Sequence, residues 1–179
     1  MKKKARTKFI PAFMGLPTKL LFISSITAGF LWVAPVLAGT GQNVSGWAWS
    51  ETIGWISFNN ISGGGAVNYG VNIDLGNGKL SGYAWSENIG WISFNEADTG
   101  APPADDPCSD ISCLAKATPS GNLGKSNVNI YGWARALSNG GGWDGWIRFD
   151  HDENDKVYID SVGNFHGYAW GSDVVGWIN

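Results

Sequence analysis

Residues 46–58 of the chain read GWAWSETIGWISF, and residues 82–94 repeat this phrase as GYAWSENIGWISF. Two looser copies open at Gly132 and Gly167. The four openings are 36, 50 and 35 residues apart, which gives a natural period of about 36 residues. A unit of this length buries its apolar face only against neighbouring units. The sequence therefore predicts a tandem array.

The second unit contains three short runs rich in β-branched and aromatic residues, at 69–74, 79–86 and 90–95. Such runs are typical of strands. The residues between them include Gly and Asn, which tolerate the positive φ angles of tight turns. We therefore predict an all-β fold of antiparallel three-stranded meander repeats, packed as a sandwich- or propeller-like array.

Side chains alternate across a strand, so Trp47 and Trp49 share one face and Gly46 and Ala48 share the other. Tryptophan recurs at fixed positions of the repeat, and this regularity predicts that the rings pack in the core, between one unit and the next. The recurring residues are Trp49, Trp55, Trp85, Trp91, Trp146, Trp170 and Trp177.

The fourth copy stops at Asn179, before the Phe that closes the other three copies. Two interpretations stay open. Either the sequence is part of a longer chain, or something else completes the last strand.

The first 38 residues have the pattern of an export signal. This segment contains six basic residues and no acidic ones, and its residues 20–38 carry no charge. We predict cleavage after Ala38, and hence an exported protein located outside the cell or on its surface. An uncleaved membrane anchor is the alternative, because an apolar run of 19 residues is about long enough to cross a bilayer.

The remaining chain is predicted to comprise repeats 1 and 2 (39–96), an inserted surface loop (97–127) and repeats 3 and 4 (128–179), of which repeat 4 is incomplete. It carries six basic and fifteen acidic residues, a formal net charge of −9. Nucleic acid is therefore not an expected partner, since it requires a basic surface.

The inserted loop is rich in Pro, Asp, Ser and Gly and contains the two cysteines, Cys108 and Cys113. In an exported chain such a pair is expected to form a local disulfide.

One tryptophan lies outside the repeated positions. Trp143 follows three glycines and precedes Asp144, and Arg135 is near in sequence. If any ring is displayed for a ligand, we expect this one, with Arg135 and Asp144 as polar partners. A flat ring with a polar edge suits the apolar face of a sugar.

Residues 150–155 offer oxygen ligands at alternate positions, Asp150, Asp152 and Asn154, as the start of a calcium loop does. The glycine expected at the sixth position is Asp155, and the acidic residue expected at the twelfth is Ser161. A solvated hairpin turn is the alternative. No other cofactor is expected.

Catalytic motifs are not found in the sequence. Glu51 and Glu87 occupy the same position in two copies, as turn residues do, and no nucleophile motif accompanies His151 or His166. The chain is therefore predicted not to be an enzyme.

The phrase Gly-aromatic-Ala-Trp-Ser, followed by Ile-Gly-Trp-Ile-Ser-Phe, resembles the tandem Trp-rich repeats of uncharacterised secreted or surface proteins of bacteria, over residues 44–179. This resemblance implies location and architecture, and it brings no known activity. The expected function is a non-catalytic cell-surface module that binds glycan or another envelope component. A purely structural spacer or adhesin-stalk fragment is the alternative, and a calcium-dependent surface module is a third.

Overall fold

The computed structural model describes residues 42–100, 102, 113–152, 154 and 156–179. This part of the chain is all-β, as predicted. Its strands are β1 (Trp47–Ser50), β2 (Gly54–Ser57), β3 (Val71–Ile73), β4 (Leu80–Ser86), β5 (Gly90–Ser93), β6 (Lys116–Thr118), β7 (Val128–Tyr131), β8 (Trp133–Ala136), β9 (Trp146–Arg148), β10 (Tyr158–Ile159), β11 (Phe165–His166), β12 (Ala169–Trp170) and β13 (Trp177–Ile178). Its helices are α1 (Asn60–Gly63), α2 (Glu96–Thr99), α3 (Ser172–Val175) and the 3-10 turn η1 (Ser120–Asn122). None of these helices is long and apolar enough to span a bilayer.

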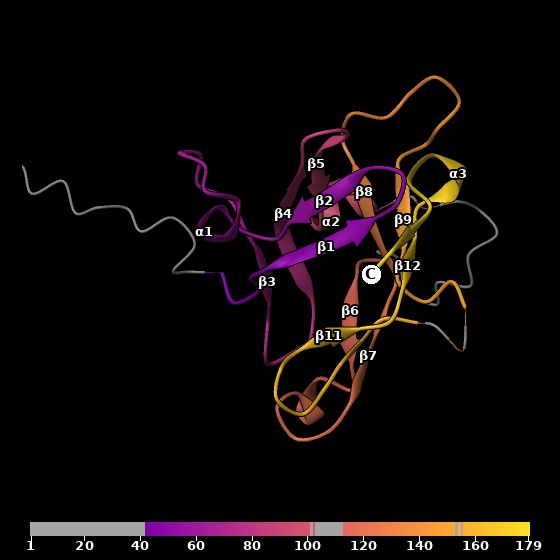
Figure 1. Cartoon of the computed structure of the whole chain (residues 1–179). Helices are drawn as coiled ribbons and strands as arrows, with labels where there is room; N and C mark the ends of the chain where they lie inside the picture. The colour runs from indigo at the N-terminus through magenta and orange to yellow at the C-terminus, as the bar shows by residue number, and fades with distance from the viewer. Residues whose placement is uncertain (1–41, 101, 103–112, 153, 155) are drawn as a thin grey trace, which may run out of the picture. The chain divides into compact units, whose positions relative to one another are not determined.

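Eight strands form a closed antiparallel barrel (Figure 1). Their order is β2, β1, β13, β12, β9, β8, β5 and β4, and β4 pairs again with β2. The first and last hairpins of the chain meet where β1 pairs with β13, with Ser50 opposite Ile178. Closure removes the exposed edges that a flat sheet of this kind would leave. The predicted sandwich- or propeller-like array is not confirmed.

Each of the four sequence copies contributes one hairpin to the barrel. The hairpins are β1–β2, β4–β5, β8–β9 and β12–β13, and all four place an alanine directly opposite an isoleucine. These pairs are Ala48 and Ile56, Ala84 and Ile92, Ala134 and Ile147, and Ala169 and Ile178. They face the barrel interior, where seven of them belong to the main hydrophobic core and Ala48, which is partly buried, packs against it. An eight-stranded barrel has an interior just wide enough for side chains, so one small and one branched residue per hairpin fill it.

The tight hairpin turn is built by the serine and glycine of the phrase. Ser50 Oγ accepts hydrogen bonds from the backbone N–H groups of Thr52 (3.1 Å) and Ile53 (3.3 Å). Gly54 then takes a φ of +73°, and Gly90 takes the same value in the second hairpin. Since L-residues with a side chain rarely adopt this angle, glycine fixes the point at which the chain reverses.

A second sheet continues from one end of the barrel. Its order is β11, β10, β7 and β6. A single bridge between Lys79 and Lys116 joins β6 to the start of β4, whose first half pairs with β3. In Figure 1, β6, β7 and β11 lie together at the lower end of the view.

The glycine that opens the third and the fourth copy lies where the chain passes from the second sheet into the barrel. Gly132 separates β7 from β8, and Gly167 lies between β11 and β12. All four opening glycines have positive φ angles, between +86° and +96°. At Gly82 and Gly132 a Cβ atom would also collide with backbone carbonyl groups of the neighbouring strand. The backbones therefore approach closely at this passage, which only glycine permits.

The tryptophans of the repeat are not in the core, and this part of the sequence prediction is wrong. Trp55 is 59% exposed, Trp49 and Trp177 are each 42% exposed, and of the recurring rings only Trp146 is buried. Alternation was predicted correctly, but the small face of each hairpin is the inner one. An indole does not fit where alanine and isoleucine already fill the barrel.

The inserted segment is also more ordered than predicted. Residues 101 and 103–112, including Cys108, lie outside the described residues. The segment then forms β6, and Ala115 and Ala117 are fully buried in the core. Their alternate spacing is that of a strand with one buried face, which the surrounding Pro, Ser and Gly residues conceal in the sequence.

Two glycine variants separate backbone strain from close packing. Gly82→Ala is expected to destabilise the fold through both its positive φ and a collision with the Gly70 carbonyl. Gly46→Ala is the matched control, because its φ of +96° is similar and no atom lies within 4 Å of the added Cβ. We expect Gly46→Ala to cost about 1–3 kcal/mol, and Gly82→Ala to cost about 2 kcal/mol more. Urea unfolding measures both, and equal losses would contradict the close approach of the strands.

Candidate functional site

Every barrel hairpin carries three outward-facing side chains at equivalent positions, which we call a triplet. The first triplet is Trp47, Trp49 and Trp55, the second is Tyr83, Trp85 and Trp91, the third is Trp133, Arg135 and Trp146, and the fourth is Tyr168, Trp170 and Trp177.

The geometry within the triplets is nearly constant. The middle residue lies directly opposite the third across the hairpin, with ring centroids 4.8 Å apart for Trp49 and Trp55 and 4.6 Å apart for Trp85 and Trp91. In the third hairpin Arg135 replaces the indole, and its guanidinium lies 4.8 Å from the Trp146 ring. Such cross-strand aromatic and cation–π pairs stabilise a hairpin. The tryptophans thus mainly stabilise the pairing of the two strands within each hairpin.

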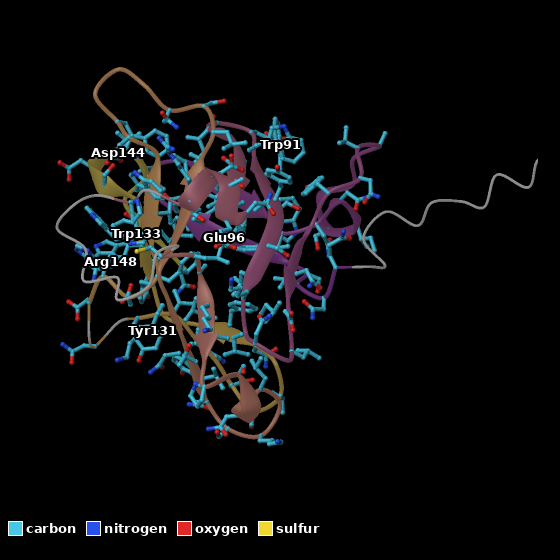
Figure 2. The ribbon with its side chains drawn as sticks, turned by 180° about the vertical axis from the view of Figure 1, so that it is seen from behind. Trp91, Glu96, Tyr131, Trp133, Asp144 and Arg148 are labelled. Atoms are coloured by element: carbon cyan, nitrogen blue, oxygen red, sulfur yellow. The ribbon has the colours of Figure 1, made fainter. Side chains whose placement is uncertain are left out.

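The four triplets differ in what covers them. The third is buried, with Trp133 and Trp146 at 8% and 6% exposure, and Cys113 packs in the same cluster. The backbone N–H of Trp133 donates to the carbonyl of Cys113 (2.9 Å), so the end of the inserted segment lies along this hairpin. Figure 2 shows Trp133, Arg148 and Asp144 on this side of the molecule. The second triplet is partly covered by Tyr69, whose ring is 5.2 Å from that of Trp91.

The first and fourth triplets are the most exposed of the four, and they are neighbours because β1 pairs with β13. Trp47 is 50% exposed and Tyr168 is 41% exposed. An open hollow of about 640 Å³ lies between the two hairpins. Its lining is formed by Trp49, Glu51, Thr52, Tyr168, Gly176, Trp177 and Asn179. We call this hollow the aromatic groove.

The aromatic groove combines flat apolar rings with a few polar groups. Trp49, Tyr168 and Trp177 supply the rings, while Glu51 and Asn179 supply hydrogen-bonding groups. His151 extends the aromatic surface beside it, because its ring stacks on Trp170 and meets Trp177 edge-on, both at 5.6 Å. Rings with polar neighbours are the usual composition of a site for small polar molecules.

The site predicted around Trp143 is assembled only in part. Arg135 Nε donates to the backbone carbonyl of Asp144 (3.3 Å), so these two residues do come together. Trp143, however, packs against the main core, and its indole nitrogen is buried without a hydrogen-bond partner. This ring is therefore not displayed, and the aromatic groove holds the displayed rings instead. The sequence signal that could have located the groove is the repeat itself. The recurring tryptophans lie on the face opposite the alanines, and that face is the outer one.

The residues predicted to bind calcium have other roles where the structure describes them. Asp150 Oδ1 accepts from Arg148 Nε (3.3 Å) and from the backbone N–H of Gly132 (3.4 Å). Asn95 makes the same contact with the N–H of Gly82 (2.8 Å), so Asp150 acts as a structural residue of the repeat. Asp152 Oδ1 accepts from the N–H of Asn154, as in a turn. Among the described residues, no three His, Cys, Asp or Glu side chains gather as a metal site.

The predicted disulfide stays a prediction, because Cys108 lies outside the described residues. Cys113 itself is buried, at 6% exposure, beside the third triplet.

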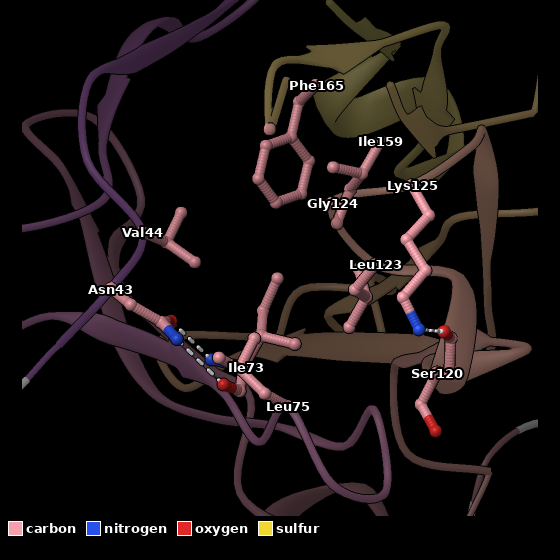
Figure 3. A pocket seen from close by; sticks show the side chains of 12 residues that line it. Asn43, Val44, Ile73, Leu75, Ser120, Leu123, Gly124, Lys125, Ile159 and Phe165 are labelled. Atoms are coloured by element: carbon pink, nitrogen blue, oxygen red, sulfur yellow. Dashed lines mark hydrogen bonds between the residues drawn. The ribbon is translucent and has the colours of Figure 1, made fainter. Parts of the chain in front are cut away.

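A second hollow, of about 500 Å³, lies at the far end of the second sheet (Figure 3). Several of its polar groups already have partners. The Asn43 side chain bonds both the N–H and the carbonyl of Ile73, at 2.7 and 2.8 Å, and Lys125 Nζ donates to the Gly121 carbonyl (2.9 Å). We therefore prefer the aromatic groove as the candidate site.

Among the described residues, Asp160 has a strongly lowered pKa. A hydrogen bond with His166 (3.0 Å), together with donors from Asn164 and Val162, lowers the pKa of Asp160 well below its usual value. These contacts close the turn between β10 and β11, so the shift reflects a structural role.

Comparison with protein families, with characterised proteins and with solved structures found no match to this chain.

The third triplet yields a test of the structural role of Arg135. Arg135→Gln removes its contact with the Trp146 ring and its bond to Asp144, and we expect a loss of about 0.5–1 kcal/mol in the free energy of unfolding. Arg135→Trp should retain more stability, because the other three hairpins carry Trp at this position. Chemical denaturation measures both variants. A Trp variant no more stable than the Gln variant would contradict the equivalence of the triplets.

Proposed function

We propose that this chain is an exported, non-catalytic binding module of the cell surface, and that it recognises glycan through the aromatic groove. Residues 1–38 would serve as the export signal, with cleavage after Ala38. The observation that carries the proposal is the unequal cover of the four triplets. The two most exposed triplets lie next to each other and enclose a groove.

The chemistry of the groove suits a sugar. One face of a pyranose ring presents only C–H groups, and it packs well on a flat indole or phenol ring. The hydroxyl groups around the sugar need hydrogen-bond partners, for which Glu51, Thr52 and Asn179 are exposed beside Trp49 and Trp177. The acidic balance of the exported part favours a neutral or cationic glycan, since a polyanion would be repelled.

The placement of two carboxylates supports a role outside catalysis. Glu51 and Glu87 occupy equivalent places directly after β1 and β4, in the turns of two different hairpins. Two carboxylates that occupy equivalent turns of different hairpins are not expected to act together on one substrate bond.

We also propose the finer organisation that the sequence suggests, four meander units of about 36 residues of which the last is incomplete. The equal registers of the four hairpins support it. The resemblance to Trp-rich surface repeats of bacteria supports the same organisation and the location.

A structural spacer or stalk fragment is the second candidate. It is favoured by the cross-strand pairs, which stabilise every hairpin, including the third, whose rings are buried. In that case the rings need no ligand.

A titration distinguishes the two functions. A glycan array selects a sugar, and tryptophan fluorescence then gives its affinity for the unmodified chain. We expect Trp177→Ala to weaken binding about tenfold or more, equal to about 1.4 kcal/mol. Trp85→Ala is the matched control, because Trp85 occupies the position of Trp49 in the second hairpin but does not line the groove.

The control should bind as the unmodified chain does, and circular dichroism should confirm that both variants fold. No response of the unmodified chain at millimolar sugar would reject the binding function and favour the spacer.

A further inference from the structure

The third triplet shows how this barrel places a positive charge on its outward rings. The Arg135 guanidinium lies 4.8 Å from the centroid of the Trp146 ring, and the Arg148 guanidinium lies 5.5 Å from that of Trp133 (Figure 2). Both indoles of this triplet therefore carry a cation that the chain itself supplies. The face of an aromatic ring attracts a positive charge through its quadrupole, and indole does so most strongly.

The first and fourth triplets present similar rings without such a cation. The residue equivalent to Arg148 is Ser57 in the first hairpin and Asn179 in the fourth, and neither side chain is charged. No Lys or Arg of the described residues lies over a ring of these two triplets. The remaining cation–π contact of the described chain joins Lys156 to Tyr131, in the second sheet.

The aromatic groove between these two triplets has a negative side chain beside its rings. Among the described residues that line it, Glu51 alone is charged, and its side chain is exposed. The rings of Trp49, Tyr168 and Trp177 share this lining and are 41–42% exposed. His151 contacts Trp177 from beside the groove and is not part of the lining. A carboxylate and the faces of aromatic rings both attract a cation and both disfavour an anion.

The basic residues of the described chain lie outside this lining. Two of them pair with acids elsewhere, Lys79 with Glu96 at 3.5 Å and Arg148 with Asp150 at 3.3 Å. The residues after position 38 comprise six basic and fifteen acidic ones, so the surrounding charge is negative as well. A cationic ligand is therefore attracted both by the groove and by the chain as a whole.

We propose that the aromatic groove selects glycans whose sugars carry positively charged amino groups. The C–H face of the sugar packs on one ring of the groove, while its ammonium group lies on the face of another and pairs with Glu51. The groove has a volume of about 640 Å³, which fits an oligosaccharide segment better than an isolated ammonium ion, since ligand sites measure about 300–1,000 Å³. This inference rests on the proposed function and narrows it from glycans in general to those with free amino groups.

Two oligosaccharides that differ at one substituent of each sugar test this selection. The β-1,4-linked tetramer of glucosamine is positively charged at about pH 6, where carboxylates are ionised, and the tetramer of N-acetylglucosamine is neutral. We expect the glucosamine tetramer to bind the unmodified chain about tenfold more tightly. Added salt should weaken its binding more than that of the acetylated tetramer, because salt screens exposed charges. Tryptophan fluorescence measures each affinity.

Glu51→Gln removes the charge of the groove and keeps the size of the side chain. We expect the preference for the glucosamine tetramer to fall to about threefold or less, while the affinity for the acetylated tetramer stays the same. Glu87→Gln is the matched control, because Glu87 follows β4 as Glu51 follows β1, is also exposed, and does not line the groove. Both variants change the net charge equally, so a loss confined to Glu51→Gln assigns the effect to the groove.

The outcomes separate this inference from the proposed function. Equal affinity of the unmodified chain for the two tetramers, or an equal loss of preference in both variants, would overturn the selection for amino groups. Weaker binding of both tetramers to Trp177→Ala would in that case still support a glycan site. If neither tetramer binds but the glycan array yields another sugar, this inference alone fails, and if the array yields none, both fail. Tighter binding of trilysine than of the glucosamine tetramer would also overturn it, in favour of a cationic peptide.

Discussion

The narrow interior of the eight-stranded barrel is the constraint on which the rest of the structure depends. Each hairpin places one alanine opposite one isoleucine inside, and these side chains fill the space. A larger residue has no room there. The indole rings are therefore on the outside. In the third and fourth copies the chain passes from the second sheet into the barrel at a glycine with a positive φ angle.

The outward rings are stabilising before they are functional. In each hairpin a ring or guanidinium packs across the strands on the ring opposite, within 4.6–4.8 Å. This pairing explains why tryptophan recurs in every copy, whether or not a ligand binds. What distinguishes one face is its greater exposure in the structure described. Tyr69 packs against the second triplet and Cys113 against the third, whereas the first and fourth are the most exposed.

The junction between the fourth and the first copy brings the two most exposed triplets together. It closes the barrel through the pairing of Trp49 with Asn179, whose backbone groups exchange hydrogen bonds of 2.7 and 2.9 Å. The aromatic groove lies on its outer side.

The sequence by itself determined the local structure of this protein. Alternation and turn residues located β3, β4 and β5 in the second unit, and the repeat predicted equivalent hairpins. It could not locate the candidate site, since Trp143 stands apart in sequence and yet packs on the core, whereas Trp49 and Trp177 look like core residues and are exposed. Because side chains alternate along a strand, the sequence shows which of them share a face, but it does not show which face is inside. That choice depends on the pairing of β1 with β13 and of β2 with β4, between residues far apart in the chain, and only the tertiary structure decides it.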